Sequence, residues 1–162
     1  MFTGRLISIH IAPSAGAPMQ KLDSVEAIAG RGLRGDRYFA GTGHWSSSPG
    51  VSRDVTLVEI ESLEALGREK NPIDPETLAE LAGTGLRRNL VTRGVPLNHL
   101  VGVEFQVGDV RLRGTRLCEP CHYLESLTGN TLFQALVHRA GLRCDLVTGG
   151  ILRVGDAVSL QA

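Results

Sequence analysis

The 162-residue sequence has no net charge, no long hydrophobic run and no recognisable secretion signal. Its 17 Lys and Arg residues balance 17 Asp and Glu residues. Generic binding to nucleic acid or to a membrane surface favours a basic excess, so this balance argues against both kinds of partner. The apolar stretch at residues 7–11 is too short for a membrane span or a signal sequence. We therefore expect a cytoplasmic protein, and the length predicts one domain over residues 1–162.

Cysteine is also scarce, with three residues in the chain. An odd number of cysteines in a reducing compartment indicates reactive or metal-binding thiols more often than disulfides. The sequence contains no catalytic-triad order, phosphate-binding P-loop or dinucleotide-binding glycine motif that rises above chance. The chemistry of the protein is therefore expected to depend on a thiol.

Glycine, by contrast, is abundant, and short alternating apolar and polar stretches predict a mainly β fold, barrel-like with a few short helices. The predicted strands cover residues 5–11, 25–29, 55–60, 87–94, 110–117 and 142–147. Val-Gly-Asp turns at residues 107–109 and 154–156 each predict a hairpin. Helices are predicted over residues 59–70, 122–127 and 130–139, and from residue 74 to the glycines at 83 and 85. Residues 32–50, rich in glycine and serine, predict a long loop.

The pair Cys118-x-x-Cys121 lies where a predicted strand passes into a helix. Backbone N–H groups at a helix N-terminus favour negative charge, so a thiolate at Cys121 would be a good nucleophile or metal ligand, with Cys118 turned inward. A thioredoxin-like dithiol would need a βαβ context, which this pattern lacks. Both cysteines could also be buried apolar residues.

A structural zinc site is a further alternative for the two cysteines, and it needs four ligands. The residues left to complete it show no second close pair. They are His44, His99, His122, His138 and Cys144.

Three other groups carry candidate chemistry. Arg87, Arg88 and Asn89 suit phosphate oxygens, although lone arginines usually lie on a solvated surface. An Asp36–Arg37 pair would hold the long loop. His44 and the neighbouring Trp45 would either line a pocket for a planar heterocycle or anchor the loop.

Taken together, the motifs of the chain resemble those of the MOSC domain family, named after the C-terminal domain of molybdenum cofactor sulfurases. The resemblance is greatest to small stand-alone bacterial members. It rests on residues 30–38, 87–94, 107–109, 118–121, 149–150 and 154–156.

The resemblance implies a barrel-like fold and a molybdenum cofactor, Mo-molybdopterin. The family's invariant cysteine matches Cys121, which would ligate the metal and be the catalytic residue; soft sulfur donors suit such a metal. Arg87 and Asn89 would contact the pterin or its phosphate, and residues 35–37 would form a pocket wall. The candidate cofactor-binding residues are Gly35, Asp36, Arg37, His44, Arg87 and Asn89.

The resemblance also implies an activity. Relatives that hold the metal reduce N-hydroxylated compounds, such as hydroxylamino purines and amidoximes, to amines. Such a small-molecule substrate would need a separate reductase as electron donor. Alternatively, Cys121 would carry a persulfide for cofactor or metal–sulfur cluster sulfuration. The pyridoxal-phosphate desulfurase domain of the larger sulfurases is not in this sequence, so the sulfur donor would be another protein. A third alternative is a cofactor-binding module without turnover.

Overall fold

The computed structural model describes residues 1–48, 53–66, 68, 85–128 and 134–160. Within these residues no helix is long and apolar enough to cross a membrane. The elements, in chain order, are β1 (Thr3–Ile11), β2 (Gln20–Leu22), β3 (Ser24–Ile28), β4 (Gly32–Leu33), α1 (Arg37–Ala40), β5 (Val55–Glu59), α2 (Ile60–Leu66), β6 (Leu90–Arg93), η2 (Leu97–Leu100), β7 (Glu104–Val107), β8 (Val110–Leu117), α4 (His122–Thr128), η3 (Gln134–Leu136), β9 (Leu142–Leu146), β10 (Gly150–Arg153) and β11 (Ala157–Leu160).

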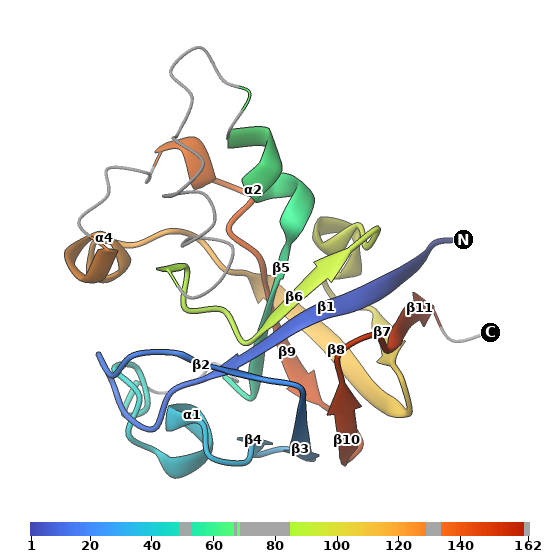
Figure 1. Cartoon of the computed structure of the whole chain (residues 1–162), viewed down its shortest axis with the longest axis horizontal. Helices are drawn as coiled ribbons and strands as arrows, with labels where there is room; N and C mark the ends of the chain where they lie inside the picture. The colour runs from blue at the N-terminus through green and yellow to red at the C-terminus, as the bar shows by residue number, and fades with distance from the viewer. Residues whose placement is uncertain (49–52, 67, 69–84, 129–133, 161–162) are drawn as a thin grey trace.

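Seven strands close into a barrel (Figure 1). Their order is β11-β7-β8-β9-β5-β6-β1, and β1 pairs again with β11, while β2 extends the sheet from the other half of β1. Neighbouring strands in this sheet are antiparallel except β5 and β6, which are parallel. The predicted mainly β, barrel-like fold is therefore confirmed.

The two Val-Gly-Asp turns have different outcomes. At residues 107–109 the turn joins β7 to β8 in a hairpin, as predicted. At residues 154–156 the predicted hairpin is wrong, because β10 pairs with β3 in a separate three-stranded sheet and β11 pairs with β7 and β1. The turn is held by backbone bonds to β1 instead: the amide of Leu6 donates to Asp156 and that of Gly155 donates to Leu6.

Alternation along the strands places the core inside the barrel. On β9, Leu142, Cys144 and Leu146 point inward and are buried, while Arg143 points outward. Phe105 and Leu112 from β7 and β8 are fully buried in the same core. Burying one such side chain contributes about 1.5–3 kcal/mol. The same alternation leaves polar residues on the outer face of the barrel, where the site lies.

A second apolar cluster covers part of that outer face, over β5 and β6. Its buried members are Val58, Leu63, Leu66, Leu86, Val91, Leu136 and Ala140. The helix predicted over residues 59–70 appears as α2, and that predicted from residue 74 lies outside the described residues. The described part of 130–139 contains only the 3-10 turn η3, and the predicted long loop contains β4 and the single-turn helix α1.

Candidate functional site

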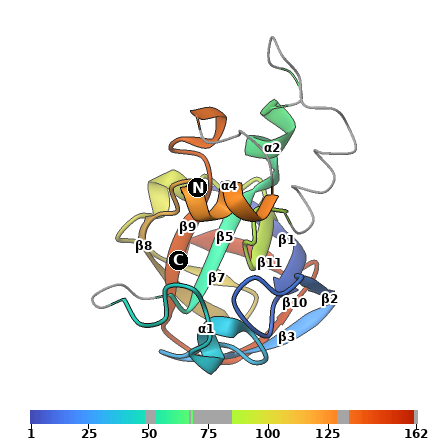
Figure 2. The same ribbon diagram turned by 90° about the vertical axis from the view of Figure 1, so that its left-hand side faces the viewer.

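The site lies on the outer face of the barrel, over one register row that crosses three strands. Thr56 on β5 is paired with Arg143 on β9, and Arg143 is paired with Arg116 on β8. Figure 2 looks onto this side of the molecule: α4 lies above, α1 lies below, and β5 and β9 run between them. Segments far apart in the sequence therefore form the walls of one depression.

Two adjoining cavities occupy this depression. The inner cavity has a volume of about 60 Å³ and the outer cavity about 520 Å³; ligand pockets usually measure about 300–1,000 Å³. The inner cavity is lined by Arg37, Tyr38, His44, Trp45, Arg53, Thr56, Arg87, Arg88, Cys118, Glu119, Cys121, Tyr123 and Arg143. The outer cavity is lined by Trp45, Ser48, Arg53, Arg116, Leu117, Glu119, Pro120, Cys121 and Arg143.

Cys121 lies between the end of β8 and the start of α4, as predicted, and it lines both cavities. Its side chain is half-buried and packs partly against the outer apolar cluster. Cys118 and Cys144 are buried, and burial raises the pKa of the Cys144 thiol, which keeps it protonated. Cys121 is thus the one cysteine of the three with an accessible thiol beside a cavity.

The loop that carries Cys121 is tied to a later part of the chain. The amide of Cys118 donates to the carbonyl of Gly141 at 2.7 Å. The carboxylate of Glu119 accepts from the amide of His138 at 2.9 Å and lies 2.9 Å from its Nδ1. Burial acts to raise the pKa of Glu119, but the bonds from His138 outweigh it and hold that pKa below its usual value. No three His, Cys, Asp or Glu side chains among the described residues gather around a possible metal position.

Arg87 presents a guanidinium to the inner cavity from a strained backbone. Its φ of 55° lies in the left-handed region, which is unusual for a residue with a side chain. Nη1 donates to the carbonyl of Ala17 at 2.7 Å, whereas Nη2 is buried without a partner among the described residues. Burial, and then the nearby Arg37, lower the pKa of Arg87. Nη2 of Arg87 is therefore a hydrogen-bond donor that is available to a ligand oxygen.

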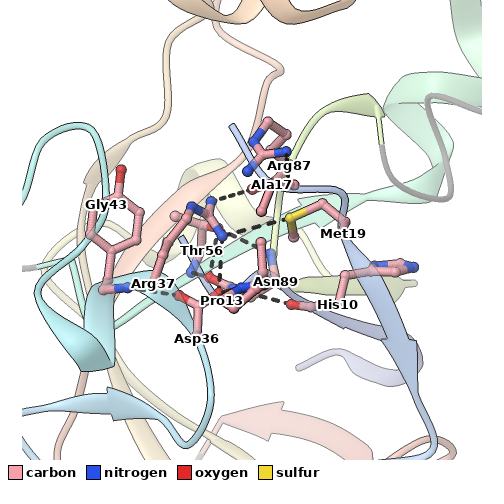
Figure 3. Close-up of polar contacts among 12 residues, drawn as sticks. His10, Pro13, Ala17, Met19, Asp36, Arg37, Gly43, Thr56, Arg87 and Asn89 are labelled. Carbon is pink, nitrogen blue, oxygen red and sulfur yellow. Dashed lines mark hydrogen bonds and ion pairs between the residues drawn. The ribbon is translucent and has the colours of Figure 1, made fainter. Parts of the chain in front are cut away.

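A buried polar cluster of Asp36, Arg37, Thr56 and Asn89 adjoins the inner cavity, which Arg37 and Thr56 help to line. Figure 3 shows the polar contacts of the cluster. The predicted Asp36–Arg37 pair is confirmed, with Nη1 at 2.9 Å from Oδ1. Nη2 of Arg37 donates to the carbonyl of Arg87 at 3.1 Å and holds it in position.

Asn89 joins three segments within this cluster. Its Oδ1 accepts from the amide and hydroxyl of Thr56, both at 3.1 Å. Its Nδ2 donates to the carbonyl of His10 at 3.1 Å and to Asp36 at 3.3 Å. Asn89, Asp36 and Gly35 do not line either cavity, and their role as cofactor contacts stays a prediction. Of the six predicted cofactor residues, the structure brings Arg37, His44 and Arg87 together at the inner cavity.

A group of aromatic side chains lines part of the inner cavity. The ring of His44 stacks on that of Tyr123 from α4, with centroids 3.7 Å apart and planes 11° apart. Trp45 lies edge-on to His44, at 4.6 Å and 88°. Gly43, the residue before His44, packs closely against the Tyr38 ring, and a Cβ there would lie 2.5 Å from that ring. Of the two predicted alternatives for His44 and Trp45, lining a pocket or anchoring the loop, the structure shows that both residues line the pocket.

The sequence profile of the MOSC domain matches residues 42–159 of the chain. The chain belongs to the MOSC domain family. Solved structures of similar fold include the YuaD protein of Bacillus subtilis, with a TM-score of 0.71 and 20% identity over 99% of this chain and 100% of that one. YiiM of Escherichia coli has a TM-score of 0.68 and 16% identity over 98% and 70% of the two chains. YiiM of Geobacillus stearothermophilus has a TM-score of 0.66 and 11% identity, over 98% and 75%. No curated protein matches the chain.

Sequence reasoning did not single out several residues that line this MOSC pocket, among them Arg53, Arg116, Tyr123 and Arg143. Arg53, Arg116 and Arg143 all line the outer cavity. Burial lowers the pKa of Arg53, and Arg143 and then Arg116 add to this lowering. The signal that could have found them is the strand register, since Arg116 and Arg143 lie opposite each other only once β8 and β9 are paired. Among the residues that the structure describes, six arginines line the two cavities, and Glu119 is the one acidic residue that does so.

Proposed function

We propose that this MOSC protein binds the molybdenum cofactor in the two cavities and holds its metal through Sγ of Cys121. The observation that supports this best is the position of Cys121, whose half-buried side chain borders both cavities, which Arg53 and Arg143 also line. A thiolate is the soft ligand that such a metal prefers. The outer cavity, at about 520 Å³, lies in the range of cofactor sites.

The inner cavity offers the donors that a pterin phosphate requires. Arg37 and Arg87 lie there, and Nη2 of Arg87 is a buried donor without a partner among the described residues. Arginine forks bind phosphate oxygens in pairs, and charge-assisted bonds of this kind are strong. His44 and Tyr123 present stacked rings to the same space, which suits a planar heterocycle. The residues present therefore fit the group.

The reaction that we propose is the reduction of an N-hydroxylated compound to its amine. It consumes two electrons and two protons, breaks the N–O bond and releases water. When bound, the cofactor would supply the two-electron exchange at its metal, and a separate reductase would supply the electrons. Arg53 and Arg143 border Cys121 in both cavities, so their N–H groups are placed to bind the oxygen that leaves as water. Three free thiols support a reducing compartment, and we propose the cytoplasm.

One observation favours a second candidate function, a sulfur carrier. Cys118 is 2% exposed, so it offers no accessible thiol to displace sulfur held on Cys121. A donor persulfide would pass its outer sulfur to the Cys121 thiolate, which becomes a persulfide while the donor leaves as a thiol. This function needs a sulfur-donor protein and no bound pterin.

Cys121→Ser tests the ligand role. Freshly purified wild type and variant would be compared by elemental analysis for molybdenum and by pterin fluorescence, with Cys118→Ala as the control that removes the neighbouring thiol. We expect Cys121→Ser to lose molybdenum and the reduction of N-hydroxylated substrates, whereas Cys118→Ala keeps both. Equal molybdenum in Cys121→Ser and wild type would refute the ligand role.

Mass spectrometry of the native protein separates the two candidate functions. An added sulfur atom on Cys121 in protein without pterin would favour the carrier. Protein that holds molybdenum but turns over no hydroxylamine or amidoxime would instead be a binding module.

A further inference from the structure

Glu119 shares the pocket with arginines, but its carboxylate is bonded to a residue outside the pocket. Arg53 and Arg143 line both cavities together with Glu119. A carboxylate in such surroundings is expected to pair with a guanidinium, because charge-assisted bonds between Arg and carboxylate are strong. Both oxygens of Glu119 instead contact His138, which lines neither cavity. The role of this contact is the question that the geometry raises.

His138 holds the carboxylate from an unusual backbone conformation. Its amide donates to Oε2 of Glu119 at 2.9 Å, and its Nδ1 lies 2.9 Å from Oε1. Its φ of 62° lies in the left-handed region, which among the described non-glycine residues only Arg87 shares. Nδ2 of Asn98 donates to the carbonyl of His138 at 2.7 Å. Such conformations persist where surrounding contacts impose them, and they cluster at functional sites.

The stability of the fold does not account for this pair. The side chain of His138 is 76% exposed and that of Glu119 is 44% exposed. Ion pairs with this degree of exposure contribute little to stability. The loop that carries Cys121 also has a separate backbone tie, from the amide of Cys118 to the carbonyl of Gly141. What the pair does determine is the direction in which the carboxylate of Glu119 points.

We propose that His138 is a positioning residue that keeps the carboxylate of Glu119 from pairing with the arginines of the pocket. The field around Cys121 then stays positive and favours anionic ligands. Without the imidazole, rotation of the Glu119 side chain brings its carboxylate to Arg53 or Arg143, which a ligand anion would otherwise meet. This inference rests on the proposed function in treating the pocket as the site of an anionic cofactor. The charge around Cys121 can nevertheless be measured without that cofactor.

The alkylation of Cys121 by two reagents of different charge measures this field. Iodoacetate is anionic and iodoacetamide is neutral, and both react with the thiolate. The ratio of their rate constants therefore cancels the fraction of thiolate and reports the charge near the sulfur. The full chain would be produced in cells that make no molybdopterin, because a bound metal would block the thiol, and reduced before use. Cys118 and Cys144 are buried, and Cys121→Ser gives the background reaction.

A set of variants separates the imidazole from the backbone of His138. His138→Gly accepts the left-handed φ and keeps the amide, but it removes the imidazole. We expect the ratio of iodoacetate to iodoacetamide rates to fall about threefold, because a negative charge moves toward the guanidinium groups beside the thiol. His138→Asn also tolerates this φ and offers a side-chain N–H near the position of Nδ1, so it should keep the wild-type ratio. Circular dichroism and thermal melting would confirm that each variant folds.

The double variant identifies Glu119 as the group through which His138 acts. Glu119→Gln removes the charge that is expected to move, so His138→Gly combined with Glu119→Gln should have a ratio at least equal to that of wild type. Two outcomes would overturn the role of His138: a wild-type ratio in His138→Gly, or a ratio in the double variant as low as in His138→Gly. The molybdenum content of Cys121→Ser tests the proposed function, whereas the alkylation ratio tests His138 in protein without cofactor, so either can fail alone.

Discussion

Two groups of polar side chains lie at or next to the pocket, and they differ in how far their hydrogen bonds are satisfied. In the buried polar cluster of Asp36, Arg37, Thr56 and Asn89, the carboxylate, amide and hydroxyl groups all have partners. In the outer cavity, Arg116 and Arg143 face each other without a partner among the described residues. Buried polar groups that are paired hold segments of the chain together. Neighbouring cations without partners lower the stability of the fold, but their N–H groups remain available to bind a ligand.

The two groups therefore have different roles, although they lie near each other in space. The buried cluster joins the loop before α1 to β1 and β5 through Asp36 and Asn89. Through Arg37 it also fixes the carbonyl of Arg87, and thereby the guanidinium that enters the inner cavity. The cluster therefore positions the site, while the outer arginines remain available for binding.

The largest effect should come from breaking the buried cluster. Asp36→Ala would leave the Arg37 guanidinium, 6% exposed, without its counter-ion, and would leave the amides of Ala12 and Tyr38 unpaired. We expect a loss of about 3–5 kcal/mol in the free energy of unfolding, measured by urea denaturation. Glu26→Ala removes an exposed ion pair with Arg34 and should change stability little. Similar losses in the two variants would contradict the structural role of Asp36.

A smaller effect concerns His10, whose backbone carbonyl accepts from Asn89 of the cluster and whose ring nitrogens are buried without partners among the described residues. Burial, and then Lys21, lower its pKa from 6.5 to about 4. Between pH 6.5 and 4 the His10 ring of the unfolded chain binds a proton more readily than that of the folded chain. The contribution of neutral His10 to stability should therefore be fully present above pH 6.5 and be lost as the pH drops toward 4. The expected loss is about 2 kcal/mol. The free energy of unfolding of wild type and of His10→Leu would be measured by urea denaturation at pH values from 7 to 4. We expect wild type to lose more stability than the variant as the pH falls. Equal pH dependence of the two proteins would contradict the prediction.

The smallest effect, and the one that sharpens the comparison, is expected at Arg143. Arg143→Gln relieves repulsion with Arg116 and removes no bond to another described residue. We expect the free energy of unfolding to stay equal or to rise by about 0.5 kcal/mol, as measured by thermal and urea denaturation. A clear loss would show that Arg143 contributes to the fold, and the contrast between the two groups would then fail.

The fold could be predicted where local patterns decide it. The strand at residues 110–117 and the helix from His122 follow from alternation and spacing, and both are confirmed. The turn at residues 154–156 could not be judged in this way, because its local chemistry matches that at residues 107–109 while the partners of β10 and β11 come from elsewhere in the chain. Pairing between distant strands is a property of the whole barrel.

The residues of the candidate site also differ in whether a local sequence pattern reveals them. Cys121 was found because a strand–helix junction is visible in the sequence, and the pair of Asp36 with Arg37 because the two are adjacent. Arg143 was overlooked because, read alone, it is one polar residue in an alternating strand. Its position opposite Arg116 depends on a register shift in β8 between Gly114 and Arg116, which no local pattern reveals.

The closure of the barrel by its first and last strands has a consequence for synthesis. The N-terminal half of β1 pairs with β11, from Thr3 opposite Ser159 to Arg5 opposite Ala157. A nascent chain that has released every strand up to β10 from the ribosome still carries open edges on β1 and β7. Such edges readily pair with other chains. Premature termination only a few codons before residue 157 should therefore yield an aggregation-prone product. The barrel can close only after the segment that contains β11 has been translated.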